Sequence, residues 1–215
     1  MAASQDLKQM VRSQLLASGI RDRHVLGAFL KVDRRCFVPV ELRAHAYDNC
    51  PILIGRGQTI SQPLMVADML QELQVHRNQR VLEVGSGSGY VLALIHAMGA
   101  AAFGIERHPD LAERARGDLE AAGYTGIRLK PGDGTFGWAD EAPFQRILIS
   151  AACPHIPPPL LEQLLPGGIL VAPVGGESQQ ILTRITRLPS GGFEESRGTP
   201  CVFVPLIGKF ASPRR

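Results

Sequence analysis

The sequence has 215 residues, of which 45% are hydrophobic, 20% are charged and 6% are aromatic. A chain of this length and composition buries one sizeable core, so we expect a single domain over residues 1–215. The formal net charge is only +3 and no block of like charges occurs, which argues against nucleic acid as a partner. The most apolar stretch, Val91 to Ile105, is shorter than a membrane span, so we expect no membrane partner either.

The N-terminal residues include Asp6, Lys8 and Arg12, which is not the pattern of a signal peptide. We therefore expect a cytoplasmic protein. Neither a C-x-x-C pair nor an H-x-x-x-H spacing occurs, so we predict reduced thiols, no disulfide framework and no bound metal. The cysteines are Cys36, Cys50, Cys153 and Cys201.

Helical patterns dominate the first sixty residues. Apolar side chains recur at helical spacing between Leu7 and Leu16, and Asp22 is positioned to cap a second short helix. Turn-forming residues then crowd positions 46–63, before Pro63 opens a third helix. We therefore expect residues 1–60 to form a helical cap that includes a loop for substrate and cofactor.

Residues 61–215 are expected to form a Rossmann-like core, because short apolar runs alternate with helical patterns from Arg80 onward. This alternation predicts an α/β fold with a doubly wound parallel sheet and helices on both faces. Residues 179–188 and 201–208 are strand-like runs separated by a Gly/Ser-rich loop without a helix. We expect them to pair as an antiparallel edge of the sheet.

The most informative motif is VLEVGSGSGY, in which a strand leads into Gly85, Gly87 and Gly89 and then into a helix. Such a turn lies at the carboxyl end of a strand, where open α/β sheets bind ligands, and glycines let the backbone approach the ligand closely. A dinucleotide fingerprint would need its third glycine where this chain has Tyr90. The spacing therefore favours S-adenosylmethionine over a nicotinamide dinucleotide.

Three acidic residues accompany this motif. Glu106 ends the next strand, about 20 residues past the glycines, where an acid can accept hydrogen bonds from ribose hydroxyls. Asp133 follows the third strand within GDGTFGW, beside glycines that permit close approach to an adenine. Glu83 lies inside the first strand and is expected to support the glycine turn by hydrogen bonding. Three loops thus converge on one nucleoside-like ligand.

Ser61 lies two residues before Pro63, at a helix entrance. Its position fits a helix N-cap and a functional hydroxyl equally well. Upstream, Gly55 and Gly57 flank Arg56, which fits either a loop that moves over a bound cofactor or a rigid turn.

Six blocks of the sequence occur in the order found in one enzyme family and together span nearly the whole chain. They resemble the protein-L-isoaspartate O-methyltransferase family, and the combination of GQTISQP with a later FVPL is the most specific part of the resemblance. The blocks are DRRCFVP (33–39), IGRGQTISQP (54–63), LEVGSGSGY (82–90), GDGTFGW (132–138), SAACPHIPPPLLEQLLPGGILVAPVG (150–175) and FVPLIG (203–208).

The resemblance implies a class I S-adenosylmethionine-dependent methyltransferase with a seven-stranded sheet whose last strands are interchanged. It implies transfer of a methyl group from S-adenosylmethionine to the α-carboxylate of L-isoaspartyl residues, as a step in the repair of damaged proteins. The expected partners are therefore isoaspartyl-containing proteins and peptides, and we expect the enzyme to be a monomer.

The resemblance also assigns site residues. The family's catalytic serine falls on Ser61, which we expect to orient the carboxylate without becoming a covalent nucleophile. Val202, Phe203 and Val204 are expected to shape the peptide pocket at an edge strand, although some bacterial members have Arg in place of Val202. The cofactor contacts fall on Thr59, Ile60, Ser61, Gly85, Ser86, Gly87, Glu106, Arg107, Asp133 and Gly134.

Two other enzyme functions and one non-enzymatic function stay open on the sequence alone. A related methyltransferase could act on a peptide aspartate in biosynthesis, or on a small molecule. An adaptor could bind S-adenosylmethionine without turnover.

Overall fold

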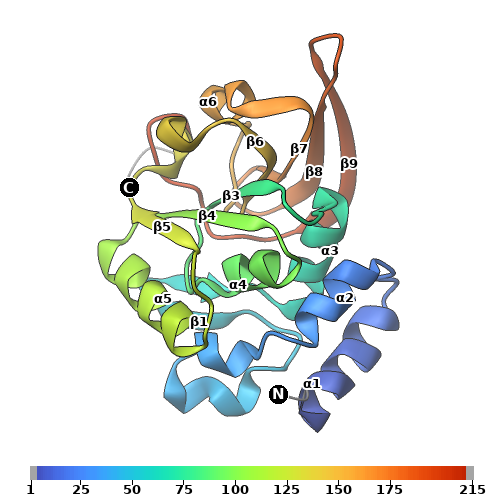
Figure 1. Cartoon of the computed structure of the whole chain (residues 1–215), viewed down its shortest axis with the longest axis vertical. Coiled ribbons are helices and arrows are strands. Elements are labelled where there is room, and N and C mark those ends of the chain that lie inside the picture. Colours follow the sequence, from blue (N-terminus) through green and yellow to red (C-terminus); the bar gives the residue numbers. More distant parts are fainter. Residues whose placement is uncertain (1–3, 212–215) are drawn as a thin grey trace.

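The computed structural model describes residues 4–211, and its central element is a seven-stranded sheet (Figure 1). The strand order is β5-β4-β3-β6-β7-β8-β9. The strands from β5 to β7 pair in parallel, whereas β8 pairs antiparallel with both β7 and β9. The strands are β3 (Arg80–Val84), β4 (Ala101–Glu106), β5 (Arg128–Pro131), β6 (Phe144–Ile149), β7 (Leu164–Gly175), β8 (Gln180–Arg187) and β9 (Phe193–Cys201).

Helices precede the sheet and connect its parallel strands. Alpha helices α1 to α3 come first in the chain, α4 and α5 link β3 to β5, and α6 links β6 to β7. They are α1 (Gln5–Met10), α2 (Arg23–Phe29), α3 (Pro63–Leu73), α4 (Tyr90–Ala97), α5 (Pro109–Ala121) and α6 (Pro158–Glu162). A π-helical stretch (Val11–Leu16) continues α1, and short 3-10 helices lie at Arg34–Phe37, Val40–His45, Gly134–Phe136 and Ala139–Glu141. None of the helices in residues 4–211 has the length and apolarity that a membrane crossing requires.

The expected helix start at Asp22 is confirmed. The Asp22 carboxylate accepts hydrogen bonds from the backbone N–H groups of His24 at 2.7 Å and Val25 at 3.3 Å, and so satisfies two donors that a helix N-terminus leaves free. At the first helix, Ser4 has the same role and accepts from Leu7 N.

Residues 46–63, expected as a loop, contain a two-stranded antiparallel hairpin of β1 (Ile52–Gly55) and β2 (Gln58–Ile60). Its turn is Gly55, Arg56 and Gly57, with φ angles of +102°, +54° and +70°. Glycine adopts this left-handed region without steric cost, so the two glycines that flank Arg56 permit a tight hairpin turn.

The edge of the sheet differs from the expectation. The edge strand is Phe193–Cys201 and not residues 201–208, because the chain turns tightly at Gly191 and Gly192 and pairs Phe193 with Arg187. The side chains of residues 193–200 are exposed on both faces of the strand, so this strand has no alternation of apolar and polar residues that could reveal it. Residues 202–208 instead return across the sheet as an extended segment.

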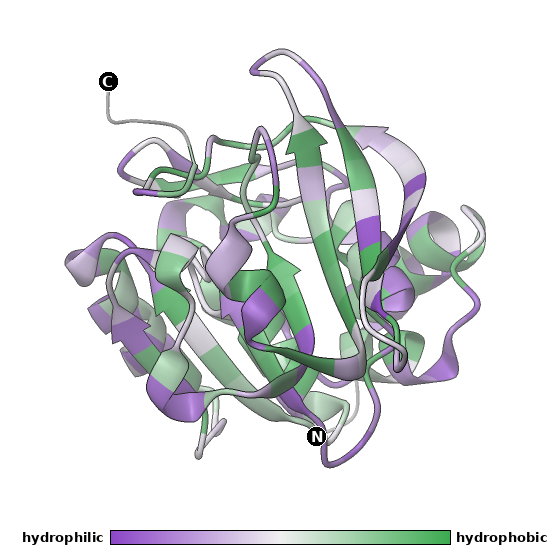
Figure 2. Ribbon diagram, turned by 90° about the horizontal axis from the view of Figure 1, so that it is seen from above, coloured by the Kyte–Doolittle hydropathy of each residue, from purple (hydrophilic) through white to green (hydrophobic). Residues whose placement is uncertain are grey.

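The sheet buries apolar side chains on both faces. One face packs against α1 to α5 through a large cluster that includes Val81, Leu148 and Leu182. The other face carries a smaller cluster around Phe103 and Ile147, covered by α6 and the segment after β9. Figure 2 shows hydrophobic colours concentrated in the central strands and hydrophilic colours toward the periphery. Helices therefore cover both faces, as expected, but unequally.

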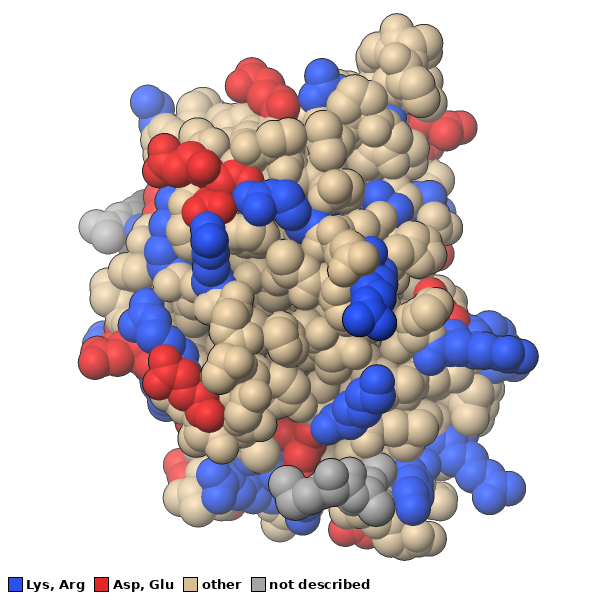
Figure 3. All heavy atoms as spheres, in the orientation of Figure 1, with Lys and Arg blue, Asp and Glu red and all other residues tan. Residues whose placement is uncertain are grey.

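Charged side chains of both signs occur on the face shown in Figure 3, where broad uncharged areas separate them. The arrangement agrees with the small net charge of the sequence.

The strand order reverses direction at β3. The next strand in the sequence, β4, lies on one side of β3, whereas the later strand β6 lies on the other side. This reversal makes the carboxyl ends of β3 and β6 the place where an open α/β sheet binds its ligand.

Candidate functional site

Three glycines carry the chain from β3 into α4. The φ angles of Gly85, Gly87 and Gly89 are +80°, +52° and +82°, which side chains with a Cβ rarely adopt. A Cβ on Gly87 would also approach Ile54 Cδ1 to 3.2 Å, so the glycine turn packs closely against the β1–β2 hairpin. The turn lies at the carboxyl end of β3, as the motif predicted.

Glu106 ties this turn to the next strand. It is 4% exposed; its Oε2 accepts a hydrogen bond from Gly87 N at 2.8 Å and its Oε1 accepts one from His108 N at 2.9 Å. Each carboxylate oxygen has a further acceptor position, so the carboxylate can still accept from ligand hydroxyls. Glu106 is therefore a buried acid held by two backbone hydrogen bonds, and not a solvated acid at the start of a helix.

A pocket opens at the carboxyl ends of β3, β4 and β6, and we call it the switch-point pocket. It contains six of the ten residues that the resemblance assigned to the cofactor, namely Thr59, Gly85, Gly87, Glu106, Arg107 and Gly134. Its other lining residues are Gln58, Val84, Ile105, His108, Ser150, Ala151, Val204, Pro205, Leu206 and Ile207.

Residues 204–207 form one wall of this pocket, a role that the sequence reasoning missed. The backbone of Ala152 accepts from Leu206 N at 2.7 Å and donates to the carbonyl of Val204 at 2.8 Å, and Arg107 donates to the carbonyl of Ile207 at 3.0 Å. The FVPL block was the available signal, but its apolar pattern also fits an edge strand.

Asp133 is not among the residues that line the switch-point pocket. Its Oδ1 accepts from Thr135 N at 2.9 Å and Thr135 Oγ1 at 2.7 Å, and its Oδ2 accepts from Lys209 N at 2.9 Å. Burial opposes the ionised form, but these hydrogen bonds outweigh it and lower the pKa of Asp133. Asp133 thus fastens the segment after β9, and its contact with adenine stays a prediction.

Ser61 lies between β2 and α3 and borders two further hollows. The first, which we call the polar cavity, also contains the predicted cofactor residues Ile60 and Ser86; its full lining is Thr59, Ile60, Ser61, Val66, Met69, Glu83, Gly85, Ser86, Gly87, Ser88, Tyr90, Val91, Leu148 and Ser150. Ser61 is not the cap of α3, because the N-cap is Gln62 and the side chain that accepts from the first turn, at Leu64 N, is that of Asn49 at 3.2 Å. The capping alternative for Ser61 is therefore wrong.

The second hollow is a groove of about 430 Å³ that we call the outer groove. It contains all three residues predicted to bind substrate, Val202, Phe203 and Val204, together with Thr59 and Ser61. Thr59 thus borders the switch-point pocket, the polar cavity and the outer groove. Val204 in turn borders both the outer groove and the switch-point pocket, so the predicted substrate and cofactor residues meet along Thr59, Ser61 and Val204.

Glu83 supports the floor of the polar cavity. Its Oε1 accepts a hydrogen bond from Ser150 Oγ at 2.7 Å, so this bond supports the residue after β6 and not, as was expected, the glycine turn. Burial raises the pKa of Glu83 to about 8, although the Ser150 hydrogen bond lowers it and Glu106 adds to the rise. Three buried polar atoms around the cavity have no partner: Glu83 Oε2, Ser86 Oγ and the Tyr90 hydroxyl. Because buried polar groups are normally hydrogen-bonded, this cavity is suited to a polar ligand group.

Other reactive or aromatic residues have structural surroundings. Cys153 is buried, and burial raises the pKa of its thiol to about 12, so it is not a nucleophile at neutral pH. Trp138 packs edge-to-face on Phe103 with a centroid separation of 6.0 Å. Within residues 4–211, no group of three or more His, Cys, Asp or Glu side chains is placed to hold a metal ion.

A seven-stranded sheet in this order, a glycine turn after β3, which is the sheet's first strand in the sequence, and an acid at the end of the neighbouring strand define a class I S-adenosylmethionine-dependent methyltransferase. A crystal structure of a candidate protein-L-isoaspartate O-methyltransferase from Plasmodium falciparum, in complex with S-adenosyl-L-homocysteine, has the same fold. The TM-score is 0.83 at 25% identity, covering 95% of this chain and 99% of that one.

The sequence comparisons are more specific. The family model described as protein-L-isoaspartate(D-aspartate) O-methyltransferase matches residues 5–211, and the chain belongs to this family. The protein-L-isoaspartate O-methyltransferase of Petrotoga mobilis is 47% identical over 204 residues, which cover 94% of this chain and 96% of that protein. The one from Methanoculleus marisnigri is 47% identical over 203 residues, with coverages of 94% and 92%.

Proposed function

We propose that this protein transfers a methyl group from S-adenosylmethionine to the α-carboxylate of L-isoaspartyl residues in damaged proteins. Family membership and the names of its relatives support the reaction. The observation that carries the proposal is the position of Ser61, which borders both the polar cavity beside the glycine turn and the outer groove. A donor at this junction can hold a substrate group against a cofactor.

The residues around the glycine turn fit S-adenosylmethionine. Glu106 keeps free acceptor positions for the ribose hydroxyls, and the unpartnered atoms of Glu83, Ser86 and Tyr90 offer partners to the polar amino-acid portion of the cofactor. When bound, S-adenosylmethionine supplies an electrophilic methyl group. The remaining cofactor contacts that the resemblance implies, those of Ile60, Arg107, Asp133 and Gly134, are part of this proposal.

The substrate needs orientation more than activation. A carboxylate with a pKa near ~4 is already ionised at neutral pH, so no general base is required. The Ser61 hydroxyl donates a hydrogen bond to one carboxylate oxygen and leaves the other directed at the reacting methyl group. Alignment in a site that excludes water can contribute roughly 7–11 kcal/mol at best, and this is the main contribution we assign to the protein.

We assign the outer groove to the peptide. Val202 is 73% exposed and borders the groove with Phe203 and Val204, so this wall offers apolar contact and extended backbone to a flexible peptide. Recognition mostly through main-chain contacts suits an enzyme whose substrates share a damaged linkage and no common sequence. We also propose that residues 1–215 act as one methyltransferase domain, because a single apolar cluster extends from Leu7 to Cys201.

The test offers the purified protein labelled S-adenosylmethionine and paired peptides that differ only in an aspartyl or isoaspartyl linkage. We expect base-labile methyl esters on the isoaspartyl peptide and negligible labelling of the aspartyl peptide. Comparable labelling of both peptides would favour a biosynthetic methyltransferase. Binding of the cofactor without turnover of either peptide would favour an adaptor or a small-molecule enzyme, and binding of a nicotinamide dinucleotide in its place would overturn the cofactor assignment.

A further inference from the structure

Arg34 is a fully buried side chain with 0% exposure. Its Nε and Nη1 atoms have no hydrogen-bond partner, and its Nη2 lies 3.5 Å from the carbonyl oxygen of Ile60. The guanidinium carbon lies 5.1 Å from the centroid of the Tyr90 ring. No Asp or Glu forms an ion pair with Arg34 in the part of the chain that the structure describes.

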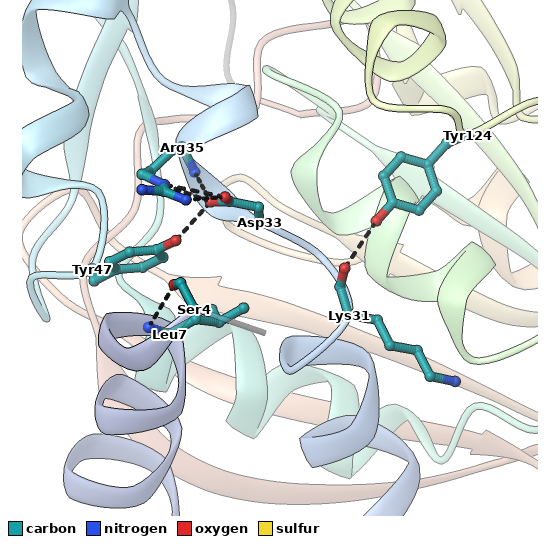
Figure 4. A network of polar contacts seen from close by, with 7 residues as sticks. All are labelled: Ser4, Leu7, Lys31, Asp33, Arg35, Tyr47 and Tyr124. Carbon is teal, nitrogen blue, oxygen red and sulfur yellow. Dashed lines mark hydrogen bonds and ion pairs between the residues drawn. The ribbon is translucent and has the colours of Figure 1, made fainter. Parts of the chain in front are cut away.

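The acid next to Arg34 in the sequence is engaged elsewhere. Figure 4 shows the Asp33 carboxylate directed at Arg35 and Tyr47, with an Arg35 Nη2–Oδ2 distance of 2.6 Å and a Tyr47 hydroxyl–Oδ1 distance of 2.7 Å. Burial lowers the pKa of Arg34 to about 10, so the side chain still carries its charge at neutral pH. Buried charges are normally paired, because an isolated one is costly to remove from water.

The position of this charge relates it to the site. Arg34 contacts the carbonyl of Ile60, the residue directly before Ser61, and stacks on Tyr90, which lines the polar cavity. We propose that Arg34 is a specificity-determining residue whose unpaired positive charge, behind the Ile60–Ser61 segment, favours a substrate that presents an anionic carboxylate at Ser61. This inference rests on the function proposed above.

The charges of the substrate and product determine whether Arg34 strengthens substrate binding or accelerates methyl transfer. The substrate carboxylate is negative, whereas the methyl ester that it becomes is neutral, and its charge decreases as the transition state is approached. A nearby positive charge therefore stabilises the bound substrate more than the transition state or the product. Arg34 is expected to strengthen substrate binding and to favour release of the ester, and it is not expected to accelerate the methyl transfer.

The experiment compares an isoaspartyl peptide with the same peptide in which a neutral primary amide replaces the reacting α-carboxylate. Dissociation constants of both peptides are measured at pH 7, in the presence of S-adenosylhomocysteine, for the wild type, Arg34→Met and Arg34→Lys. We expect the wild type to prefer the acid. Arg34→Met should reduce this preference by about 10-fold, and Arg34→Lys, which keeps the charge, should retain most of it.

Steady-state kinetics give a second measurement, because a loss of stability alone would not change the KM for the peptide. Arg34→Met should raise the KM for the peptide about 10-fold and raise kcat by a smaller factor, and should leave the dissociation constant of S-adenosylhomocysteine unchanged. An acid-to-amide preference in Arg34→Met equal to that of the wild type would overturn the inference.

If Arg34→Met does not fold, Arg34→Gln replaces it, and the wild type is itself informative. A wild-type enzyme that binds the acid and the amide peptide equally well would overturn the inference without any variant. The outcome is separable from the proposed function, because an enzyme that methylates the isoaspartyl peptide yet shows no charge preference refutes only the role of Arg34.

Discussion

Ser61 borders both the polar cavity and the outer groove, and it does not cap the helix that follows. We therefore expect Ser61→Ala to leave the free energy of unfolding within about 0.5 kcal/mol of the wild type. Turnover should fall about 10-fold to 1000-fold, because one hydrogen bond that orients the reacting group is lost. Thermal melting and steady-state kinetics on the same preparation measure the two effects.

Thr59→Ala is the matched control, since Thr59 lies two residues away and borders all three hollows. It should raise the KM for the cofactor more than it lowers kcat. A fully active but heat-sensitive Ser61→Ala enzyme would refute the orienting role.

Glu106 offers a test of the cofactor assignment. Glu106→Gln replaces one acceptor oxygen with an N–H donor, which then faces the backbone N–H of Gly87 or of His108. We expect cofactor affinity to weaken by roughly 1–3 kcal/mol, because both the glycine turn and the ribose lose an acceptor. Isothermal titration calorimetry measures the change, and an unaltered dissociation constant would contradict the assignment.

Glu83 should make stability depend on pH. Its pKa is about 8 in the folded protein against an ordinary value of 4.5, so the folded state holds a proton that the unfolded chain releases. Its stabilising effect is complete below pH 4.5 and is lost as the pH rises toward 8. Glu83→Gln lacks this titration, and its stability relative to the wild type should rise over that interval by at most about 5 kcal/mol. Urea unfolding of both proteins at several pH values tests this, and a constant difference would argue against it.

At the scale of elements, the β1–β2 hairpin positions Thr59 and Ser61, and two arginines attach it to α5. Arg114 donates from Nη2 to the carbonyl of Ile54, and Arg56 pairs with Asp110 at 2.8 Å with both side chains more than half exposed. A partly buried hydrogen bond from a charged group stabilises more than an exposed ion pair. Of the two arginines, Arg114 therefore contributes more to holding the hairpin on α5.

Arg114→Met should accordingly raise amide hydrogen exchange across the hairpin and increase the KM for the cofactor several-fold. Arg56→Ala should change both by less than about 2-fold, because exposed ion pairs contribute ~0–1 kcal/mol. Hydrogen exchange followed by mass spectrometry distinguishes the two variants. Equal effects would mean that the exposed pair matters as much as the hydrogen bond.

The elements differ in how well the sequence predicted them, and burial explains the difference. Strand β3 and the glycine turn were predictable, because a strand buried on both faces and a left-handed turn each restrict residue type locally. Strand β9 and the hairpin were not, since β9 is exposed on both faces and β2 has only three residues. The wall at residues 204–207 depends on long-range contacts with Ala152 and Arg107, which no local pattern encodes.

At the scale of the whole molecule, β9 is an edge strand that could pair with a second copy. The hairpin of β8 and β9 projects from the body of the protein (Figure 1), and β9 exposes Glu194, Glu195 and Arg197. Charged side chains on an edge strand oppose strand addition. We propose a monomer and expect light scattering to give a mass near 23.3 kDa.

The double substitution Glu195→Val and Arg197→Val removes this protection and should produce concentration-dependent self-association. Valine at two exposed helical positions, Glu113 and Glu120 of α5, is the control for added surface apolarity and should leave the mass unchanged. A wild-type dimer would show that the edge charges do not have this effect.

The wall of the switch-point pocket has a consequence for the newly made chain. Arg107 contacts the carbonyl of Ile207, a residue 100 positions later, and translation delivers residues in order from the N-terminus. A nascent chain can thus have its glycine turn and Glu106 outside the ribosome while the wall does not yet exist. Such a chain lacks one wall of the pocket, so we expect it to bind the cofactor weakly and to gain little stability from binding it. Ligand-linked stabilisation therefore begins only after residues 204–207 have left the ribosome.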